Sequence, residues 1–155
     1  MVDKLNVFSS DNFSIKKTTK DNIDEIYNFK LDTIINNNDI SEEEYVKITK
    51  YISADIKSHI DDYNMVIIEN KVVGTFCFYE DSEGYLLDEI YIISDYRGFN
   101  IGSKIIEKIK NLCLEKRKTL YLWVYKTNEG ALRLYNKLGF SIFIETETRY
   151  KMKFN

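Results

Sequence analysis

The stretch Asp95-Tyr96-Arg97-Gly98-Phe99-Asn100-Ile101-Gly102-Ser103 joins an apolar, strand-like run to a run with helical spacing. Its small residues allow the backbone to approach a ligand closely. Free N–H groups at the start of the following helix, with the helix dipole behind them, suit a phosphate. The stretch therefore predicts an anion-binding cradle. The alternative interpretation is a plain strand-to-helix turn, because short glycine motifs also arise without a ligand.

The chain after this stretch alternates between helical and strand-like patterns. Apolar residues at helical spacing predict a helix over 101–112, and a second helix over 128–138 is expected to end at Gly139. Runs of apolar and aromatic residues predict strands at 119–125, 142–145 and 149–154.

The chain before the stretch predicts three strands joined by short turns, at 65–68, 72–79 and 85–93. Two helices over 20–36 and 41–62 and a short strand over 13–17 precede them. No proline and no low-complexity tract marks a boundary, so residues 1–155 are expected to form a single domain. This order predicts an α/β (α+β) fold, with a mixed, mostly antiparallel central sheet flanked by helices.

The composition argues against several classes of protein. A formal net charge of -3 and a pI of about 5.3 disfavour nucleic acid as a partner, because phosphate binding needs clustered Lys and Arg. No apolar stretch approaches the ~20 residues that span a bilayer, and Met1–Ser10 carries no run of signal-peptide length. No membrane association and a cytoplasmic location are therefore expected. His59 is the only histidine and falls on the polar side of a predicted helix, so no metal site is expected.

The 95–103 stretch resembles the acyl-CoA loop of the GNAT superfamily, written Gln/Arg-x-x-Gly-x-Gly/Ala. Arg97 takes the first position and Gly102 the last, while Asn100 stands where the family usually has glycine. Asparagine tolerates left-handed backbone better than other non-glycine residues, so this departure is mild. The resemblance continues into Asn128-x-x-Ala131-x-x-Leu134-Tyr135-x-x-x-Gly139-Phe140 and covers the chain from about residue 63 to its end. Two separated motifs in the right order are more specific than either alone.

The resemblance implies the GNAT fold and an N-acetyltransferase that moves the acetyl group of acetyl-CoA directly to a primary amine. It implies cofactor contacts from the loop, from the backbone of the preceding strand and from the second motif: Ile90, Ile92, Arg97, Gly98, Phe99, Asn100, Ile101, Gly102, Ser103 and Asn128. The wider string from Leu87 to Phe99 resembles diamine (spermidine/spermine) acetyltransferases. The implied partner is therefore a small cationic amine, and a homodimer is left open.

The same resemblance points to three catalytic side chains. Tyr135 is expected to protonate the CoA thiolate; it lies two helical turns after Asn128 and shares its face, although an aromatic ring packed under the sheet would show the same pattern. Asp88 matches the position of the base and Glu89 that of a neighbouring acid that binds substrate. Because the two are adjacent in a predicted strand, they are expected to point to opposite faces, and one of them could be a solvated edge charge.

Three other functions stay open on the sequence alone. The same fold could bind acyl-CoA as a regulatory module without catalysis, or it could acetylate the N-terminus of a peptide or protein. A nucleotide-binding module is disfavoured, because the loop lacks the Gly-Lys-Ser/Thr ending of a Walker A loop and the first Gly-x-Gly pair of a dinucleotide fold.

Overall fold

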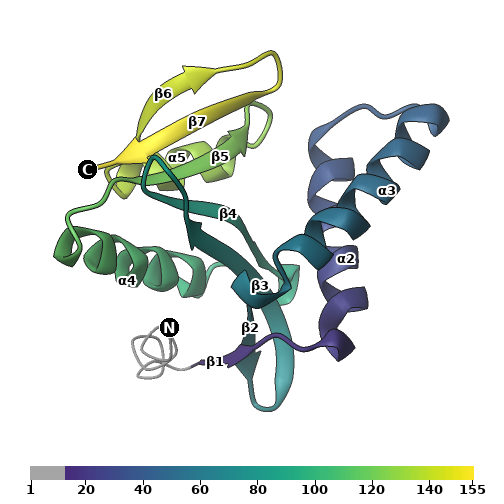
Figure 1. Cartoon of the computed structure of the whole chain (residues 1–155), viewed down its shortest axis with the longest axis horizontal. Coiled ribbons are helices and arrows are strands. Elements are labelled where there is room, and N and C mark those ends of the chain that lie inside the picture. The colour runs from purple at the N-terminus through teal and green to yellow at the C-terminus, as the bar shows by residue number, and fades with distance from the viewer. Residues whose placement is uncertain (1–12) are drawn as a thin grey trace.

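The computed structural model describes residues 13–155, in which a seven-stranded sheet carries helices on both faces (Figure 1). The predicted absence of a signal peptide concerns Met1–Ser10, which lie outside the described residues. The strands are β1 (Ser14–Lys17), β2 (Tyr63–Ile68), β3 (Lys71–Glu80), β4 (Tyr85–Ile92), β5 (Leu120–Tyr125), β6 (Ser141–Glu145) and β7 (Arg149–Phe154). The helices are α2 (Ile23–Asn37), α3 (Glu42–Ser58), α4 (Ile101–Glu115) and α5 (Glu129–Lys137), with 3-10 turns η1 (Lys20–Asn22), η2 (Ile60–Asp62) and η3 (Ser94–Tyr96).

The strand order is β1-β2-β3-β4-β5-β7-β6, and every neighbouring pair is antiparallel except β4 and β5. The parallel pair is short, because only Tyr85, Leu86 and Leu87 of β4 find partners on β5. The rest of β4 diverges from β5 and opens the sheet at its centre. The mixed, mostly antiparallel sheet expected from the sequence is confirmed.

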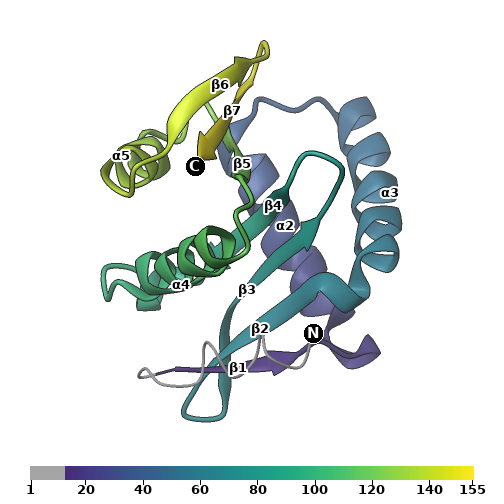
Figure 2. The same ribbon diagram turned by 60° about the vertical axis from the view of Figure 1, so that its left-hand side comes forward.

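Each face of the sheet has its own apolar core. Helices α4 and α5 cover one face through residues such as Ile105, Ile109 and Leu134, while α2 and α3 cover the other through Ile26 and Ile52. Figure 2 shows α4 and the α2–α3 pair on opposite sides of the sheet. Among residues 13–155, none of the helices combines the length and apolar character needed to cross a bilayer.

The predicted elements form where the periodicity places them, with small shifts at their ends. The helix predicted over 41–62 ends at Ser58, and η2 completes the segment. The predicted turn at Asn70-Lys71 is instead formed by Glu69 and Asn70, which both have positive φ angles. Positive φ at both central residues is the signature of a type I′ hairpin, which suits the twist of the strands.

A bulge in β4 corrects the expectation that Asp88 and Glu89 face opposite sides. Leu87 pairs with Phe78 and Glu89 pairs with Cys77, so Asp88 has no partner on β3. A bulge places two residues of one strand opposite one of the other. Alternation from Leu87, which packs on the α4 side, sends Asp88 to the α2–α3 side. Alternation from Tyr91, whose ring stacks on Phe29 of α2, sends Glu89 to the same side.

Gly74 of β3 is required by the close approach of β4. A Cβ atom at this position would lie 2.3 Å from the backbone oxygen of Tyr91 and 2.8 Å from the Cδ1 of Ile92. We expect Gly74→Ala to lower the free energy of unfolding by about 1–3 kcal/mol, measured by urea denaturation, because overpacking forces the backbone to shift. Gly130→Ala is the matched control: its Cβ would find nothing nearer than 3.9 Å, so it should gain about 0.5–1 kcal/mol of helix propensity. Equal stability of the two variants would contradict this account.

Candidate active site

A cavity of about 700 Å³ extends through the opening between β4 and β5. Its walls come from the last turns of α2, the end of β4, the loop before α4, the first turns of α4, and α5. The lining residues are Asp32, Thr33, Asn36, Asn37, Ile90, Tyr91, Ile92, Tyr96, Arg97, Gly98, Asn100, Ile101, Gly102, Ser103, Ile106, Asn128, Gly130, Ala131, Leu134 and Tyr135. Because α2 and α5 lie on opposite faces of the sheet, the cavity connects the two faces.

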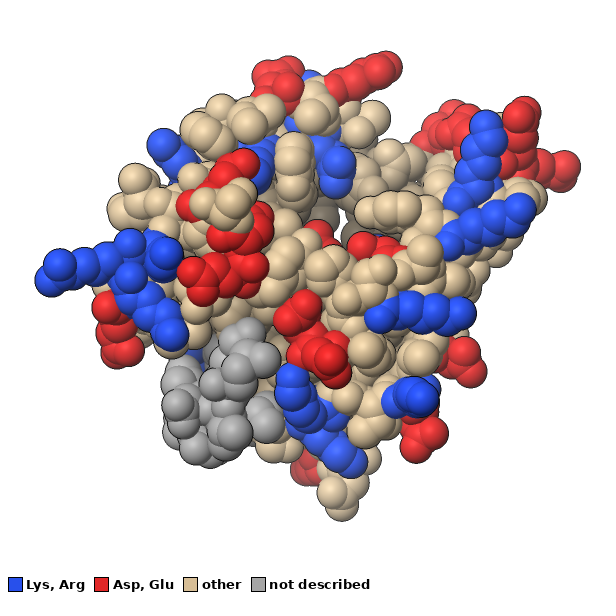
Figure 3. All heavy atoms as spheres, in the orientation of Figure 1, with Lys and Arg blue, Asp and Glu red and all other residues tan. Residues whose placement is uncertain are grey.

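The surface is hollowed on the side where the α2–α3 pair meets the β5–β7 end of the sheet. Figure 3 shows this hollow with acidic and basic side chains at its margin. Thr127, which precedes α5, donates a hydrogen bond of 2.9 Å to the backbone oxygen of Asn37 at the end of α2. This hydrogen bond joins the end of α2 to the segment before α5, beside the opening between β4 and β5.

The predicted anion cradle takes the shape that the sequence indicates. Gly98 and Asn100 both adopt positive φ angles, of 87° and 63°, so asparagine supplies the left-handed residue in place of glycine. The backbone of Asn100 starts the helix, since its oxygen accepts from the N–H of Lys104 at 3.0 Å. The N–H groups of the first turn, including those of Gly102 and Ser103, have no helical partner and are free for a ligand.

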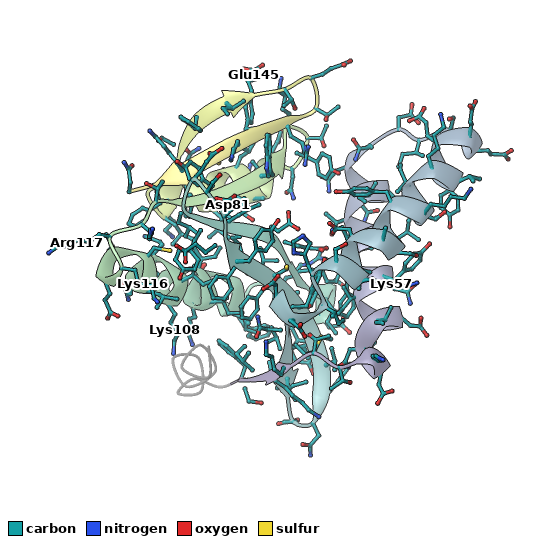
Figure 4. All side chains as sticks on the ribbon, in the orientation of Figure 1. Lys57, Asp81, Lys108, Lys116, Arg117 and Glu145 are labelled. Carbon is teal, nitrogen blue, oxygen red and sulfur yellow. The ribbon has the colours of Figure 1, made fainter. Side chains whose placement is uncertain are left out.

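Basic side chains lie at both ends of α4. Lys116 and Arg117 project outward at the C-terminal end of the helix (Figure 4), where they complement the negative end of the dipole. Lys104 lies in the first turn, so an anion at the N-terminal end would meet a positive charge as well as the backbone N–H groups and the helix dipole.

Arg97 holds the loop before α4 in contact with β4. Its Nε donates a 2.7 Å hydrogen bond to the backbone oxygen of Ile92, and its guanidinium lies 5.2 Å from the ring centroid of Tyr91. The hydroxyl of Tyr91 in turn donates a 2.6 Å bond to Asp32 of α2. The chain of contacts fixes the position of the loop relative to both β4 and α2.

Phe99 differs from the other predicted loop residues. It does not line the main cavity, its side chain is 67% exposed, and it borders a second, smaller cavity with Phe13 and Ile68. The remaining predicted contacts, from Ile90 to Asn128, are brought together on the main cavity. The position within the motif did not reveal that Phe99 turns away, because side-chain direction in an irregular loop has no simple period.

Asn128 and Tyr135 lie on one face of α5, as their spacing predicts. The side chain of Asn128 caps the helix by accepting from the N–H of Ala131 at 3.1 Å. Tyr135 lines the cavity with its ring packed near Phe140, and burial raises the pKa of its hydroxyl to about 12. Within residues 13–155 no hydrogen-bond partner is found for this hydroxyl, so it is free to meet a ligand.

Asp88 and Glu89 do not line the cavity but form a buried cluster beside it, on the α2–α3 side. Lys30 of α2 bonds the carboxylate of Asp55 and lies 3.8 Å from Oε2 of Glu89. The hydroxyl of Tyr63 donates to the same Oε2 at 3.3 Å. The cluster thus joins α2, α3, β2 and β4 through polar groups in an otherwise apolar core.

Burial dominates the electrostatics of the cluster. It raises the pKa of Glu89 to about 7, although Lys30 acts in the opposite direction. Burial also raises the pKa of Asp88 above its ordinary value, again against Lys30. For Lys30 itself burial acts to lower the pKa, but the nearby carboxylates, Glu89 first, outweigh it and hold the pKa above its usual value. Glu89 can therefore exchange a proton near neutral pH, as general bases must.

Three members of this cluster, Lys30, Asp55 and Tyr63, were not expected from the sequence. A signal was present for two of them: Lys30 falls on the apolar face marked by Ile23 and Ile26, and Asp55 falls three residues after Ile52. A charged residue on the buried face of a helix implies a partner within the core. His59 also differs from its expected surface position, because it stacks on Tyr79 at 4.4 Å and contacts Asp62 through Nδ1 at 3.1 Å.

A split central sheet, a backbone anion cradle on one face and buried carboxylates on the other define an acyltransferase of the type that transfers an acyl group from coenzyme A. A family model described as the acetyltransferase (GNAT) family matches residues 24–140, and the chain belongs to that family of N-acetyltransferases. Its fold is similar to the crystal structure of PaiA N-acetyltransferase from Thermoplasma acidophilum in complex with coenzyme A, with a TM-score of 0.74 at 15% identity over 91% of this chain and 97% of that chain.

Three curated relatives carry acetyltransferase names. An uncharacterized N-acetyltransferase of Archaeoglobus fulgidus is 25% identical over 129 residues, 78% of this chain and 88% of the relative. Thialysine N-epsilon-acetyltransferase of Bos taurus is 39% identical over 69 residues, 44% of this chain and 41% of that protein. N-alpha-acetyltransferase 50 of Danio rerio is 41% identical over 61 residues, 37% of this chain and 35% of that protein. The match thus spans less than half the length of the last two relatives.

Gly102 offers a direct test of the cradle. A Cβ atom there would meet only Cδ1 of Ile90, at 3.9 Å, so Gly102→Ala should fold and bind normally. Gly102→Glu should fold as well, but its carboxylate would lie where the first-turn N–H groups converge and would repel an anion. We expect its affinity for acetyl-CoA to fall at least about tenfold, measured by calorimetry. Unchanged affinity in a folded Gly102→Glu protein would show that the cofactor lies elsewhere.

Proposed function

We propose that this protein is an acetyl-CoA-dependent N-acetyltransferase that acetylates a small primary amine bearing positive charge. The observation that carries the proposal is the cavity that runs from the N-terminal end of α4, through the β4–β5 opening, to α2, beside the buried cluster that holds Asp88 and Glu89. A cofactor on one face and an amine on the other can meet only at such an opening.

The residues present suit acetyl-CoA. The first-turn N–H groups from Ile101 to Ser103 would hold the pyrophosphate, and Asn128 would contact the pantetheine or nucleotide arm. Beyond Leu87, β4 has no partner on β5, so the backbone of Ile90 can pair with the pantetheine amides as an added strand would. The oxygen of Ile92 already accepts from Arg97, which leaves Ile90 as the more accessible of the two predicted backbone contacts.

The side chains at the opening can serve both ends of the transfer. Glu89 accepts the proton that the ammonium form of the acceptor must lose, through a water molecule, and the neutral nitrogen then attacks the thioester carbon. The C–N bond forms, the C–S bond breaks, and Tyr135 gives its proton to the departing sulfur. The nitrogen loses its second proton as the amide forms, and that proton restores the Tyr135 hydroxyl through water. The products are the amide, the CoA thiol and one proton, which Glu89 releases to solvent.

The charges around the acceptor side favour a cationic amine. Asp55, Asp88 and Glu89 surround Lys30, and His59 and Arg149 also act on Asp88 as opposing charges. Lys30 is a single lysine set among three carboxylates, so a positively charged acceptor is attracted to the site. The bovine relative named for thialysine acetylation agrees with an amine acceptor of small size.

A turnover screen tests the proposal. Acetyl-CoA is supplied with 1,3-diaminopropane, spermidine, an aminoglycoside, lysine, thialysine or a short peptide with a free N-terminus, and the release of CoA is followed. We expect turnover with the small amines ahead of the peptide. Turnover of the peptide alone would favour a peptide acetyltransferase, and tight binding of acetyl-CoA without any turnover would favour a regulatory module.

A further inference from the structure

Lys30 is a buried lysine that the proposed chemistry does not use. Its side chain is 12% exposed, and its ammonium meets Asp55 of α3, Tyr63 of β2 at 3.4 Å and Glu89 of β4 at 3.8 Å. A buried ammonium is costly unless it is paired and hydrogen-bonded. Lys30 therefore has partners from three different elements, and two of them, Tyr63 and Glu89, are themselves joined by a hydrogen bond.

The two oxygens of Glu89 have unequal surroundings. Oε2 receives the Tyr63 hydroxyl and faces Lys30, whereas Oε1 is buried and has no hydrogen-bond partner among the described residues. The side chain is only 8% exposed. A buried carboxylate oxygen without a donor costs free energy, so Oε1 is the atom of Glu89 that a water molecule or the substrate can reach with a donor.

We propose that Lys30 is a positioning residue for acetyl transfer: together with Tyr63 it holds Oε2 of Glu89, so that Oε1 is presented to the amine or to the water that carries its proton. The inference rests on the proposed role of Glu89 as the proton acceptor. Lys30 does not touch the reacting atoms; it acts through the carboxylate.

The groups that face Glu89 show why a cation is needed there. They are Lys30 from α2, Asp55 from α3, Tyr63 from β2, Cys77 from β3 and Asp88 from β4 itself. Lys30 is the one cation of this set. Without it, three carboxylates would share a buried space, and repulsion would drive Glu89 to hold its proton at neutral pH. A protonated Glu89 cannot accept a proton from the substrate.

The test compares Lys30→Met with Lys30→Arg. The acidic limb of the pH profile of kcat/KM, measured with acetyl-CoA and 1,3-diaminopropane, should move to higher pH by about one unit in Lys30→Met, since an opposite charge within ~4–6 Å is worth at least that much. At pH 7 this corresponds to a loss of about fivefold, because the ionised fraction of Glu89 falls from about one half to about one tenth. In Lys30→Arg the acidic limb should stay at the pH found for the parent, because arginine keeps the positive charge.

Lys57→Met is the matched control. Lys57 also lies on a helix of this layer, but it is exposed and projects away from the sheet in Figure 4. The variant Lys57→Met removes one positive charge from the protein, as Lys30→Met does, and should leave the acidic limb of the pH profile at the same pH. If Lys30→Met does not fold, Lys30→Met/Asp55→Asn removes both members of the ion pair and is measured in its place.

A second measurement separates this inference from the proposed function. The side-chain carboxyl carbon of Glu89 is titrated by 13C NMR without substrate, its signal being assigned by its loss in Glu89→Gln. A higher midpoint in Lys30→Met, matched by a shifted kinetic limb, is the expected result. An unchanged midpoint in the folded variant, or a shifted midpoint with an unchanged kinetic profile, overturns the role of Lys30. A parent protein that never acetylates an amine but shows the midpoint shift overturns the proposed function and leaves the coupling of Lys30 to Glu89 standing.

Discussion

Glu89→Gln should lower kcat/KM for amine acetylation by about 10²–10³-fold, within the range typical of a lost general base. Glutamine keeps the shape of the side chain but cannot take a proton. Because burial places the pKa of Glu89 at about 7, the parent enzyme should lose activity as the pH falls below 7 and the carboxylate becomes protonated. In Glu89→Gln that limb should disappear, leaving only the rise that follows deprotonation of the amine. The measurement is a pH profile of initial rates at saturating acetyl-CoA.

Asp88→Asn is the matched control for this prediction. Asp88 lies on the same face but has no partner on β3, and the Tyr63 hydroxyl bonds Glu89 instead. Asp88 matches the position of the base in the resemblance to diamine acetyltransferases. We expect a smaller effect, expressed as a higher KM for a cationic acceptor, with the limb near pH 7 retained. The opposite ranking, with the limb lost in Asp88→Asn and kept in Glu89→Gln, would make Asp88 the base.

Much of the fold is predictable from the sequence because its helices and strands keep regular periods. Ile101, Ile105 and Ile109 repeat on one face of α4, and all three are buried against the sheet. The bulge in β4 was not predictable, since it has no period of its own. It arises where β4 leaves β5 while keeping its pairing with β3, and that requires the three-dimensional arrangement of all three strands.

The cofactor side and the acceptor side of the site also differ in how far the sequence predicts them. The cradle depends on local backbone, so Gly98 and Asn100 indicate its conformation directly. The acceptor side depends on contacts between residues far apart in the sequence: Lys30 and Glu89 meet only where α2 packs on β4. Local pattern shows that Lys30 sits on a buried helix face, but the identity of its partner comes from the packing of α2 on β4.

Tyr135→Phe should lower kcat by about 10²–10⁴-fold while leaving folding and acetyl-CoA affinity nearly unchanged. Phenylalanine keeps the ring and its contact with Phe140 but removes the proton that neutralises the departing sulfur. Because burial raises the pKa of this hydroxyl to about 12, the group is fully protonated at neutral pH and is ready to donate. A thiol has an ordinary pKa near 8.5, below that of the hydroxyl, and burial of the CoA thiolate would raise that pKa and narrow the gap that proton transfer must cross.

The alternative, a tyrosine that only packs under the sheet, predicts near-normal turnover in Tyr135→Phe. Its hydroxyl has no hydrogen-bond partner within residues 13–155, so its removal leaves no protein group unpaired and should cost little stability. Tyr85→Phe is the matched control, because Tyr85 is a buried tyrosine of the same core that does not line the cavity. We expect both variants to melt within a few degrees of the parent, and only Tyr135→Phe to lose turnover. A kcat of Tyr135→Phe within a few-fold of the parent would show that this tyrosine takes no part in the chemistry. The sulfur would then depart as the free thiolate or take its proton from water.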